Sequence, residues 1–457
     1  MRGRRALARA LARCETANER ARVTALDASS GRARGHGARA ASTSARRLAA
    51  GGDAARERER EGERGSDADA YAFASAVSRA ASLEDALRSC AGEVRRALGS
   101  GRRATWAQVY VSGGYDADEV ARAGARTREL LGGDVTVVGG VVRAGVGGGG
   151  QTSEGVAMTA ASMPGTTTCT FRAMKSSLPA LDGGASWMDF AKSAETEEAI
   201  AITALADSSF EDVDEMLERL HVAMPNSVVV GGVLDEGSVM FLNDEVVRRG
   251  MVALLVRGDF EMSAHVVHGA KPIGPVMSLT QARDSSVLEL DDTPAHPLLL
   301  ETLETLPERA KSLPVMLGVG SNGAKGGPFV CRDILSVGET GGVELAHSKW
   351  NLREGVPVQL HIRDSSWANQ EASRVMEKCA SAVKVSDHLS RAGSVGAMIF
   401  ACGNGNRMHA DDFRTRAPGT PLGGAFVRSE IAPLAEGRAS SVLSHTSAIG
   451  IYRKRSS

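Results

Sequence analysis

The sequence predicts an α/β fold with mixed sheets, built from repeated strand–helix–strand–hairpin units in two packed halves behind a disordered N-terminal tail. Two strand–helix–strand segments of equal span support this prediction, because 139 − 107 = 32 positions and 231 − 199 = 32 positions. Both end in the string Val-Val-Gly-Gly-Val, which starts at Val137 and at Val229. A shorter third copy starts with the strand 397–401 and has Leu422-Gly-Gly424 at the corresponding place. Such recurrence indicates an internal duplication.

The first 69 residues are expected to be disordered, because they have few large apolar side chains to offset the entropy of ordering. Residues 1–50 contain twelve Arg, and their only acids are Glu15, Glu19 and Asp27, so their net charge is 12 − 3 = +9. An Arg-rich, Ala/Ser-rich, acid-poor start is typical of an organelle transit peptide, which predicts a chloroplast or mitochondrial location. The alternative is a solvated basic tail on a cytoplasmic protein.

Overall composition excludes several classes of function. The net charge is −1, which argues against nucleic acid as the main partner. No run approaches the ~18 apolar residues that cross a bilayer, so no integral membrane segment is expected. The six cysteines are scattered without a C-x-x-C pair, which argues against a zinc ribbon. We therefore expect no metal and no cofactor.

The elements follow from hydrophobic periodicity and capping residues. The segment 73–98 has apolar residues at roughly helical spacing, with a second helix start at Ser82. Strand 107–111 leads to a helix that is capped by Asp116 and ended by Gly132, and strand 135–138 follows. In the second unit, strand 199–204 precedes a helix that Ser209 is expected to cap. Two hairpins are predicted, which pair 156–160 with 168–172 and 252–256 with 262–267.

Topology predicts where a ligand binds. Ligands of open α/β sheets lie beyond the carboxyl ends of the strands. Here those ends are 112–114, 139–140, 207–208, 231–232 and 402–407. The sequence Gly145-x-Gly147-x-x-Gly150 matches a dinucleotide fingerprint, but a strand and not a helix follows it. We interpret it as a flexible glycine loop over a pocket.

Several ordered motifs resemble the FIST family, in both its N-terminal and C-terminal domains. They include the segment from His268 to Pro275, Arg332-Asp-Ile334, Pro421-Leu-Gly423 and Glu430-Ile431. The resemblance implies a FIST N-like domain at 70–297 and a FIST C-like domain at 298–457. It also implies small-molecule sensing in signal transduction, and we expect a small polar metabolite such as an amino acid as ligand, without enzymatic activity. The bound state would be passed on by conformational change or by contact with a possible protein partner.

The family also implies an alternative function. Some eukaryotic members carry an F-box, which makes a substrate-recognition adaptor of a ubiquitin ligase the first alternative, although residues 1–100 contain no recognisable F-box. The family's C-x-G-R-G stretch is replaced here by Cys402-Gly-Asn-Gly-Asn-Arg407, and Ser429 replaces a family glycine. Both differences lie at the inferred pocket and bear on ligand specificity.

The candidate ligand-binding residues follow from these motifs and strand ends. They are Cys402, Asn404, Arg407, Gly424 and Glu430, with His268 and Lys271 in second rank. A helix start and Arg407 could lower the pKa of the Cys402 thiol. The alternative is a small residue at a strand end, and we favour it for reactivity.

Other polar residues allow further interpretations. A Cys-dependent hydrolase, the second alternative, would use His409 or His445 as base and Glu430 to orient it. Arg332 and Glu430 are expected to pair with each other or with a zwitterionic ligand. Asp411 and Asp412 beside His409 could bind a metal, but a solvated helix start is the favoured interpretation.

Overall fold

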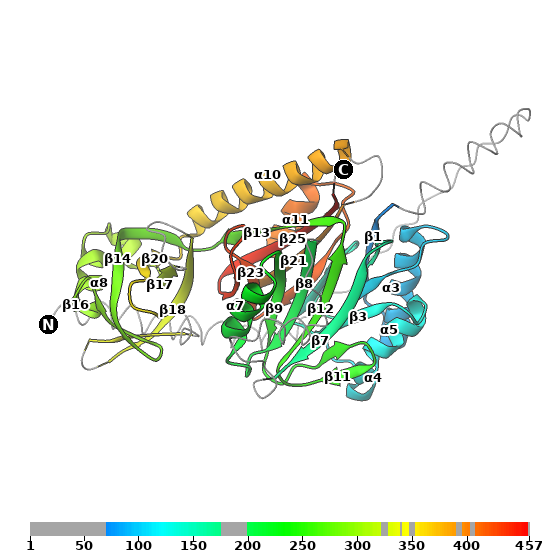
Figure 1. Ribbon diagram of the computed structural model, residues 1–457, viewed down its shortest axis with the longest axis horizontal. Helices are drawn as coiled ribbons and strands as arrows, with labels where there is room; N and C mark the ends of the chain where they lie inside the picture. Colours follow the sequence, from blue (N-terminus) through cyan, green and yellow to red (C-terminus); the bar gives the residue numbers. More distant parts are fainter. Residues whose placement is uncertain are drawn as a thin grey trace, which may run out of the picture.

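The computed structural model describes residues 70–174, 199–320, 328–338, 341–346, 352–389, 395–402 and 407–455. The expected tail at 1–69, with its transit-like segment, lies outside these residues. Three mixed six-stranded sheets and their helices form a larger body, and a small barrel lies beside it (Figure 1). The α/β fold with mixed sheets is therefore confirmed. In the described part of the chain no helix is long and apolar enough to span a membrane.

The first sheet has the strand order β1-β6-β2-β3-β10-β11. Its central strands β2 and β3 are parallel, and the other pairs in it are antiparallel. The strands are β1 (Ala72–Ser78), β6 (Gly155–Ser162), β2 (Trp106–Ser112), β3 (Thr136–Val141), β10 (Met240–Leu242) and β11 (Glu245–Val247).

The second and third sheets repeat this plan, each with one parallel pair at its centre. The second has the order β24-β23-β9-β8-β12-β7, and the third has the order β13-β25-β21-β22-β4-β5. The strands of the second are β24 (Ser440–Leu443), β23 (Ser429–Pro433), β9 (Ser227–Leu234), β8 (Ala199–Asp207), β12 (Met251–Gly258) and β7 (Thr167–Ala173). Those of the third are β13 (Phe260–His268), β25 (Thr446–Lys454), β21 (Gly396–Cys402), β22 (Leu422–Val427), β4 (Ala144–Gly147) and β5 (Gly150–Thr152).

The three sheets exchange hairpins in a cycle. The hairpin β10–β11 follows β9 of the second unit but pairs with β3 of the first. The hairpin β23–β24 follows β22 of the third unit but pairs with β9 of the second, and β4–β5 follows β3 but pairs with β22. The predicted duplication is thus a ring of three units, each completed by a hairpin from another.

The two predicted hairpins are wrong. β6 pairs with β1 and β2, whereas β7 pairs with β12 in another sheet. Likewise β12 pairs with β7 and β8, whereas β13 pairs with β25. In both cases a short turn joins two strands that belong to different sheets. The local sequence does not specify which sheet each strand joins.

Helices cover the outer faces of the three sheets, and the inner faces share one core. α3 (Leu83–Leu98) and α5 (Ala123–Leu131), which follows the short α4 (Ala117–Ala121), pack on the first sheet. α7 (Val213–Ala223) packs on the second, and α10 (Ser365–Leu389) and α11 (Arg407–Arg416) pack on the third. Tyr110, Leu205 and Phe400 occupy equivalent strand positions and are all buried in the central core.

The segment 73–98 is only partly helical, which corrects the prediction. Ala72–Ser78 is the edge strand β1, because its odd-numbered apolar residues face the central core and its alanines lie under α3. Residues Phe73 and Val77 are four apart, a spacing that fits both the 3.6-residue period of a helix and the two-residue period of a strand. The helix starts after Ser82, whose hydroxyl accepts a hydrogen bond from the Asp85 amide at 3.1 Å, as predicted. Asp116 also caps its helix, but Ser209 does not: the second-unit helix starts after Asp212.

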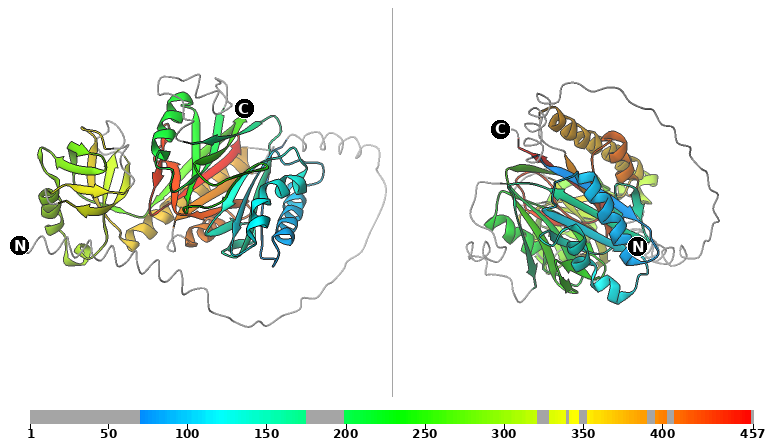
Figure 2. Two further views of the ribbon diagram at one scale, coloured as in Figure 1. Left: turned by 90° about the horizontal axis from the view of Figure 1, so that it is seen from below. Right: turned by 90° about the vertical axis from the view of Figure 1, so that its right-hand side faces the viewer.

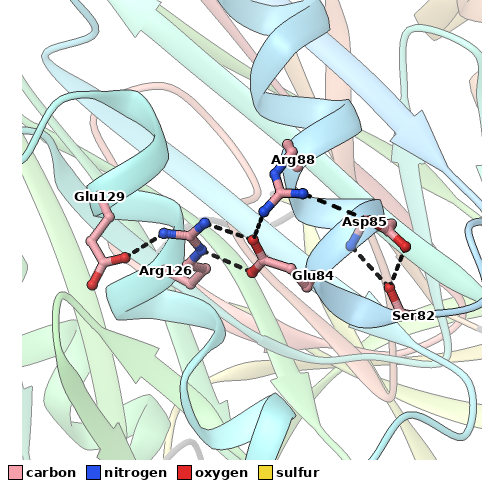
Figure 3. A network of polar contacts seen from close by, with 6 residues as sticks. All are labelled: Ser82, Glu84, Asp85, Arg88, Arg126 and Glu129. Atoms are coloured by element: carbon pink, nitrogen blue, oxygen red, sulfur yellow. Dashed lines mark hydrogen bonds and ion pairs between the residues drawn. The ribbon is translucent and has the colours of Figure 1, made fainter.

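An ion-pair network joins α3 to α5 (Figure 3). Arg126 on α5 donates two hydrogen bonds to Glu84 on α3, at 2.8 and 2.6 Å, and a third to Glu129. Bidentate arginine–carboxylate pairs fix orientation as well as distance. The network therefore links α5 to the first turn of α3, which lies beside the site described below.

The barrel is inserted between β13 and α10 of the third unit. Its strand order is β14-β20-β17-β18-β19-β15-β16, and an additional β14–β15 pairing closes the ring. The barrel lies at one end of the body in both orientations (Figures 1 and 2). Its elements are β14 (Lys271–Arg283), β15 (Ser286–Leu290), β16 (Thr293–Pro294), α8 (Ala295–Glu304), α9 (Glu308–Lys311), β17 (Val315–Gly320), β18 (Phe329–Val337), β19 (Val343–Leu345) and β20 (Pro357–Ile362).

Strands from both sides of residue 298 share sheets in the body, since β25 pairs with β13 and β22 pairs with β4. The predicted domains at 70–297 and 298–457 are regions of the sequence, and the boundary between them stays a prediction.

Candidate functional site

A cavity of about 430 Å³ lies where β1 and β2 end. Three connections form its walls: the one from β1 to α3, the one from β2 to α4, and the turn from β5 to β6. The lining is largely polar and rich in backbone groups, as is common where a small ligand is oriented by a few hydrogen bonds. The lining residues are Arg79, Ala80, Ala81, Ser112, Gly113, Gly114, Tyr115, Gln151, Thr152, Ser153, Glu154 and Gly155.

The walls are held together by hydrogen bonds between the three connections. The buried Ser112 hydroxyl lies 3.0 Å from the Thr152 carbonyl oxygen and 3.2 Å from that of Gly155, and it donates to them. Tyr115 donates to the Ala80 carbonyl at 2.8 Å, and the Arg79 guanidinium donates to the Gln151 carbonyl. The cavity is therefore a preformed feature of the folded chain.

Gly113 is required at its position in this wall. Its φ of +92° lies in the left-handed region, and a Cβ there would come within 3.0 Å of Glu154 Cα. Gly114 differs, because a Cβ at Gly114 would meet nothing within 4 Å. The adjacent glycines thus have separate roles: Gly113 allows close approach of two loops, and Gly114 leaves space.

The lining offers one cation and one carboxylate, Arg79 and Glu154, both solvent-exposed. The guanidinium of Arg79 suits a carboxylate, and Glu154 suits an ammonium group. A site with both charges and several hydroxyl and amide groups can bind a small zwitterion. In the described part of the chain no group of three or more His, Cys, Asp or Glu residues could hold a metal ion.

The glycine-rich segment from Gly145 to Gly150 forms the β4–β5 hairpin beside this cavity. Arg414 of α11 donates to the carbonyls of Gly147 at 2.8 Å and Gly150 at 2.9 Å. The chain then enters β6, so no helix N-terminus follows and the dinucleotide fingerprint is accidental, as predicted. The hairpin is anchored by these bonds, which corrects its interpretation as a flexible loop.

Cys402 and Glu430 meet in a second, buried cluster. The Cys402 amide donates to Glu430 Oε1, and the Thr446 hydroxyl donates to Glu430 Oε2 at 2.7 Å. Burial raises the pKa of Glu430 to about 8. Burial, with the nearby Glu430, also raises the pKa of the Cys402 thiol well above its ordinary value. A raised thiol pKa favours the neutral thiol, which argues against an activated thiolate and favours the interpretation as a small strand-end residue.

The two histidines considered as bases have other partners. The His445 amide donates to Cys402 Sγ at 3.1 Å, while its ring Nε2 lies 3.2 Å from both carboxylate oxygens of Asp333. The His409 ring lies 2.8 Å from the Ser447 hydroxyl, and burial lowers the pKa of His409. Each of these ring contacts uses one of the two ring nitrogens, and in the described part of the chain no hydrogen bond joins either ring to the Cys402 thiol.

The remaining predicted residues are spread over the fold. Gly424 packs against the neighbouring strand, since a Cβ there would lie 1.9 Å from the Ile399 carbonyl oxygen. His268 ends β13 beside a narrow depression between barrel and body, and burial lowers its pKa. Lys271 is exposed at the start of β14. Asn404 lies outside the described residues; Arg407 begins α11, but its side chain lies outside them.

Arg332 and Glu430 do not pair with each other, which corrects that expectation. Arg332 is almost fully buried and donates to Asp214 of α7 at 2.7 Å and to the Val442 carbonyl at 2.8 Å. Asp214 also accepts from the Val442 amide at 2.7 Å. The carboxylate that neutralises Arg332 is on a helix distant in sequence, and this partner could not be deduced from the local motif.

The cavity was predicted in part. The strand end 112–114 was expected beside a ligand, and it lines the cavity. Arg79, Tyr115, Gln151 and Glu154 were missed. Arg79 would have been recognised had Ala72–Ser78 been read as a strand, because Arg79 then follows a strand end directly. The role of Glu154 depends on the folding back of the β5–β6 turn.

Comparison with protein families assigns part of the chain. Residues 105–293 match the FIST N domain. The FIST family comprises sensory domains of signal transduction that bind small ligands. The matched region of the FIST N domain contains two of the three cavity walls, 112–115 and 151–155, and Arg79 precedes it. The resemblance of 298–457 to a FIST C domain stays a prediction. No curated protein matches the chain.

Proposed function

We propose that the chain is a sensory protein that binds a small polar metabolite, such as an amino acid, in the cavity at the ends of β1 and β2. The single observation that carries the proposal is the presence of both a cation, Arg79, and a carboxylate, Glu154, in the lining of a polar cavity of about 430 Å³. That volume lies within the range of small-molecule sites. A free amino acid carries the complementary carboxylate and ammonium groups.

The proposed role is binding without catalysis, followed by signalling to a protein partner. The raised pKa of the Cys402 thiol supports this choice over a Cys-dependent hydrolase, as does the lack, among the described residues, of a hydrogen bond from the ring of His409 or His445 to that thiol. The connection from β1 to α3 is a route for the signal, because Arg79 in the cavity precedes the helix that the Glu84–Arg126 pair joins to α5.

A thermal-shift screen of the full chain against amino acids, simple carboxylates and simple amines tests the proposal. A ligand that binds the folded state raises the melting temperature by mass action. We expect Arg79→Ala and Glu154→Gln each to weaken amino-acid binding roughly tenfold, equivalent to about 1.4 kcal/mol. The matched controls are Arg96→Ala and Glu93→Gln, which alter exposed residues of α3 away from the cavity.

The two variants also separate the two charges. Arg79→Ala is expected to remove most of the response to carboxylates, and Glu154→Gln most of the response to amines. Amino-acid shifts that are equal in both cavity variants and in both controls would refute the assignment of the cavity.

A further inference from the structure

The ring of three units brings one residue from each unit to the same end of the parallel strands. In each unit a glycine packs against the neighbouring parallel strand: a Cβ at Gly139, Gly231 or Gly424 would lie within 1.9 Å of a backbone carbonyl oxygen. Four positions later, at 139 + 4, 231 + 4 and 424 + 4, the three units carry Arg143, Asp235 and Arg428. We call these three residues the axial triad.

The axial triad is a spatial cluster as well as a sequence repeat. Arg143 donates from its amide to the Phe426 carbonyl at 3.3 Å, which joins the first unit to the third. Arg428 donates from its amide to the Val233 carbonyl at 2.8 Å, which joins the third unit to the second. The Arg143 side chain closes the ring with two hydrogen bonds to Asp235, at 2.8 and 2.5 Å.

The charges of the axial triad do not balance. Arg143 is neutralised by Asp235, whereas the exposed Arg428 forms no ion pair with any residue of the described ranges. The unpaired guanidinium therefore belongs to a residue whose backbone lies near that of Arg143, because Phe426 pairs with Ala144 on the adjoining strand. Guanidinium groups match the geometry of carboxylate and phosphate oxygens, and two from different strands can bind one anion.

We propose that the axial triad is a binding site for a small oxyanion group, a carboxylate or a phosphate, with Arg428 as the main donor and Arg143 as the second. Asp235 competes with the anion for Arg143, so it keeps the affinity moderate. The site shares no residue with the cavity lined by Arg79 and Glu154. It is therefore a second site, independent of the proposed amino-acid binding.

The test is isothermal titration calorimetry of the full chain with inorganic phosphate and, separately, with acetate, at constant ionic strength set by chloride. We expect saturable binding of at least one anion to the unmodified chain, and a comparison of the two identifies the preferred group. Arg428→Ala is expected to weaken binding at least tenfold. Asp235→Asn is expected to strengthen it severalfold, because it releases Arg143, and Arg96→Ala serves as the charge-matched control.

The comparison with Arg96→Ala separates a specific site from general charge attraction, because Arg428→Ala and Arg96→Ala each remove one positive charge. Arg428 and Asp235 are both at least partly exposed, and circular dichroism would verify that the variants fold. No saturable binding of either anion by the unmodified chain overturns the proposal. So does an affinity that Arg428→Ala leaves unchanged, or one that Arg96→Ala lowers equally. The amino-acid-induced thermal shift of Arg428→Ala is measured in parallel, so that anion binding at the axial triad and amino-acid binding in the cavity are tested separately.

Discussion

Glu430 is a fully buried carboxyl group that accepts hydrogen bonds from an amide and a hydroxyl. Neutral donors offset only part of the cost of burying a charge. For this reason the effect of burial outweighs that of the hydrogen bonds, and the pKa of Glu430 rises to about 8. Glu430 was selected from its family motif as a ligand residue; the structure places it in the Cys402 and Thr446 cluster, away from the cavity.

The raised pKa of Glu430 predicts a pH-dependent stability. The folded state holds the proton more tightly than the unfolded state does, so this contribution is fully present below about pH 4.5 and is lost as the pH rises to about 8. The upper limit of the loss is about 5 kcal/mol, at 1.36 kcal/mol for each pKa unit. Glu430→Gln, which cannot ionise, should remove this part of the pH dependence.

Urea denaturation of the unmodified chain and of Glu430→Gln between pH 5 and 8 measures the effect, with the exposed Glu93→Gln as control. As the pH rises, the unfolding free energy of the unmodified chain should fall relative to that of Glu430→Gln. Parallel pH profiles for these two proteins would show that Glu430 ionises as an ordinary surface carboxylate.

At the scale of elements, α7 connects the barrel to the body. Its Asp214 binds the buried Arg332 of β18 at 2.7 Å, and its Glu218 binds the exposed Arg353 at 3.0 Å, one helical turn further on. The adjacent Asp333 of β18 contacts His445 at 3.2 Å. Since Asp214 and Glu218 lie on the same helix and bind the same domain, they form a matched pair for experiment.

Asp214→Ala should cost about 3–5 kcal/mol of unfolding free energy, because it leaves the charge of Arg332 buried without its partner. Glu218→Ala should cost no more than about 1 kcal/mol, since its ion pair is partly exposed. Chemical denaturation of both variants gives the comparison. Equal costs would mean that burial of Arg332 does not make its ion pair more important than that of Arg353.

Several elements could be predicted from local sequence, and the failures of prediction have physical reasons. The caps at Ser82 and Asp116 depend on neighbouring residues only, and the structure has them as expected. The strands expected to end at Gly139 and Gly231 are present, but they continue through these glycines to Val141 and Leu234. The strand Ala72–Ser78 was missed because its burial on both faces hides the alternation of a half-exposed strand. The partner of Arg332 was missed because it comes from 118 residues away.

For the whole molecule, the repeat could be recognised in the sequence, but the exchange of hairpins among the three units could not. Strand pairing over such distances depends on which sheets assemble, and the hairpin sequences specify only a turn and two short strands. The same exchange produces both candidate sites. The hairpin β4–β5 leads to the turn that carries Glu154, and the junctions between units bring Arg143 and Arg428 together.

The central claim is that the cavity at the ends of β1 and β2 binds a small polar ligand. The most direct test is to fill the cavity with a side chain and measure whether ligand binding is lost. A Leu at Gly114 would add a side chain to the lining at a position where a Cβ meets no atom within 4 Å. Gly92 of α3 has the same freedom away from the cavity, so Gly92→Leu is the matched control. The measurement is the ligand-induced thermal shift of the full chain and the two variants across the amino-acid panel. We predict a shift for the unmodified chain and Gly92→Leu that is lost in folded Gly114→Leu; no shift in the unmodified chain, or one that Gly114→Leu retains, would contradict the account.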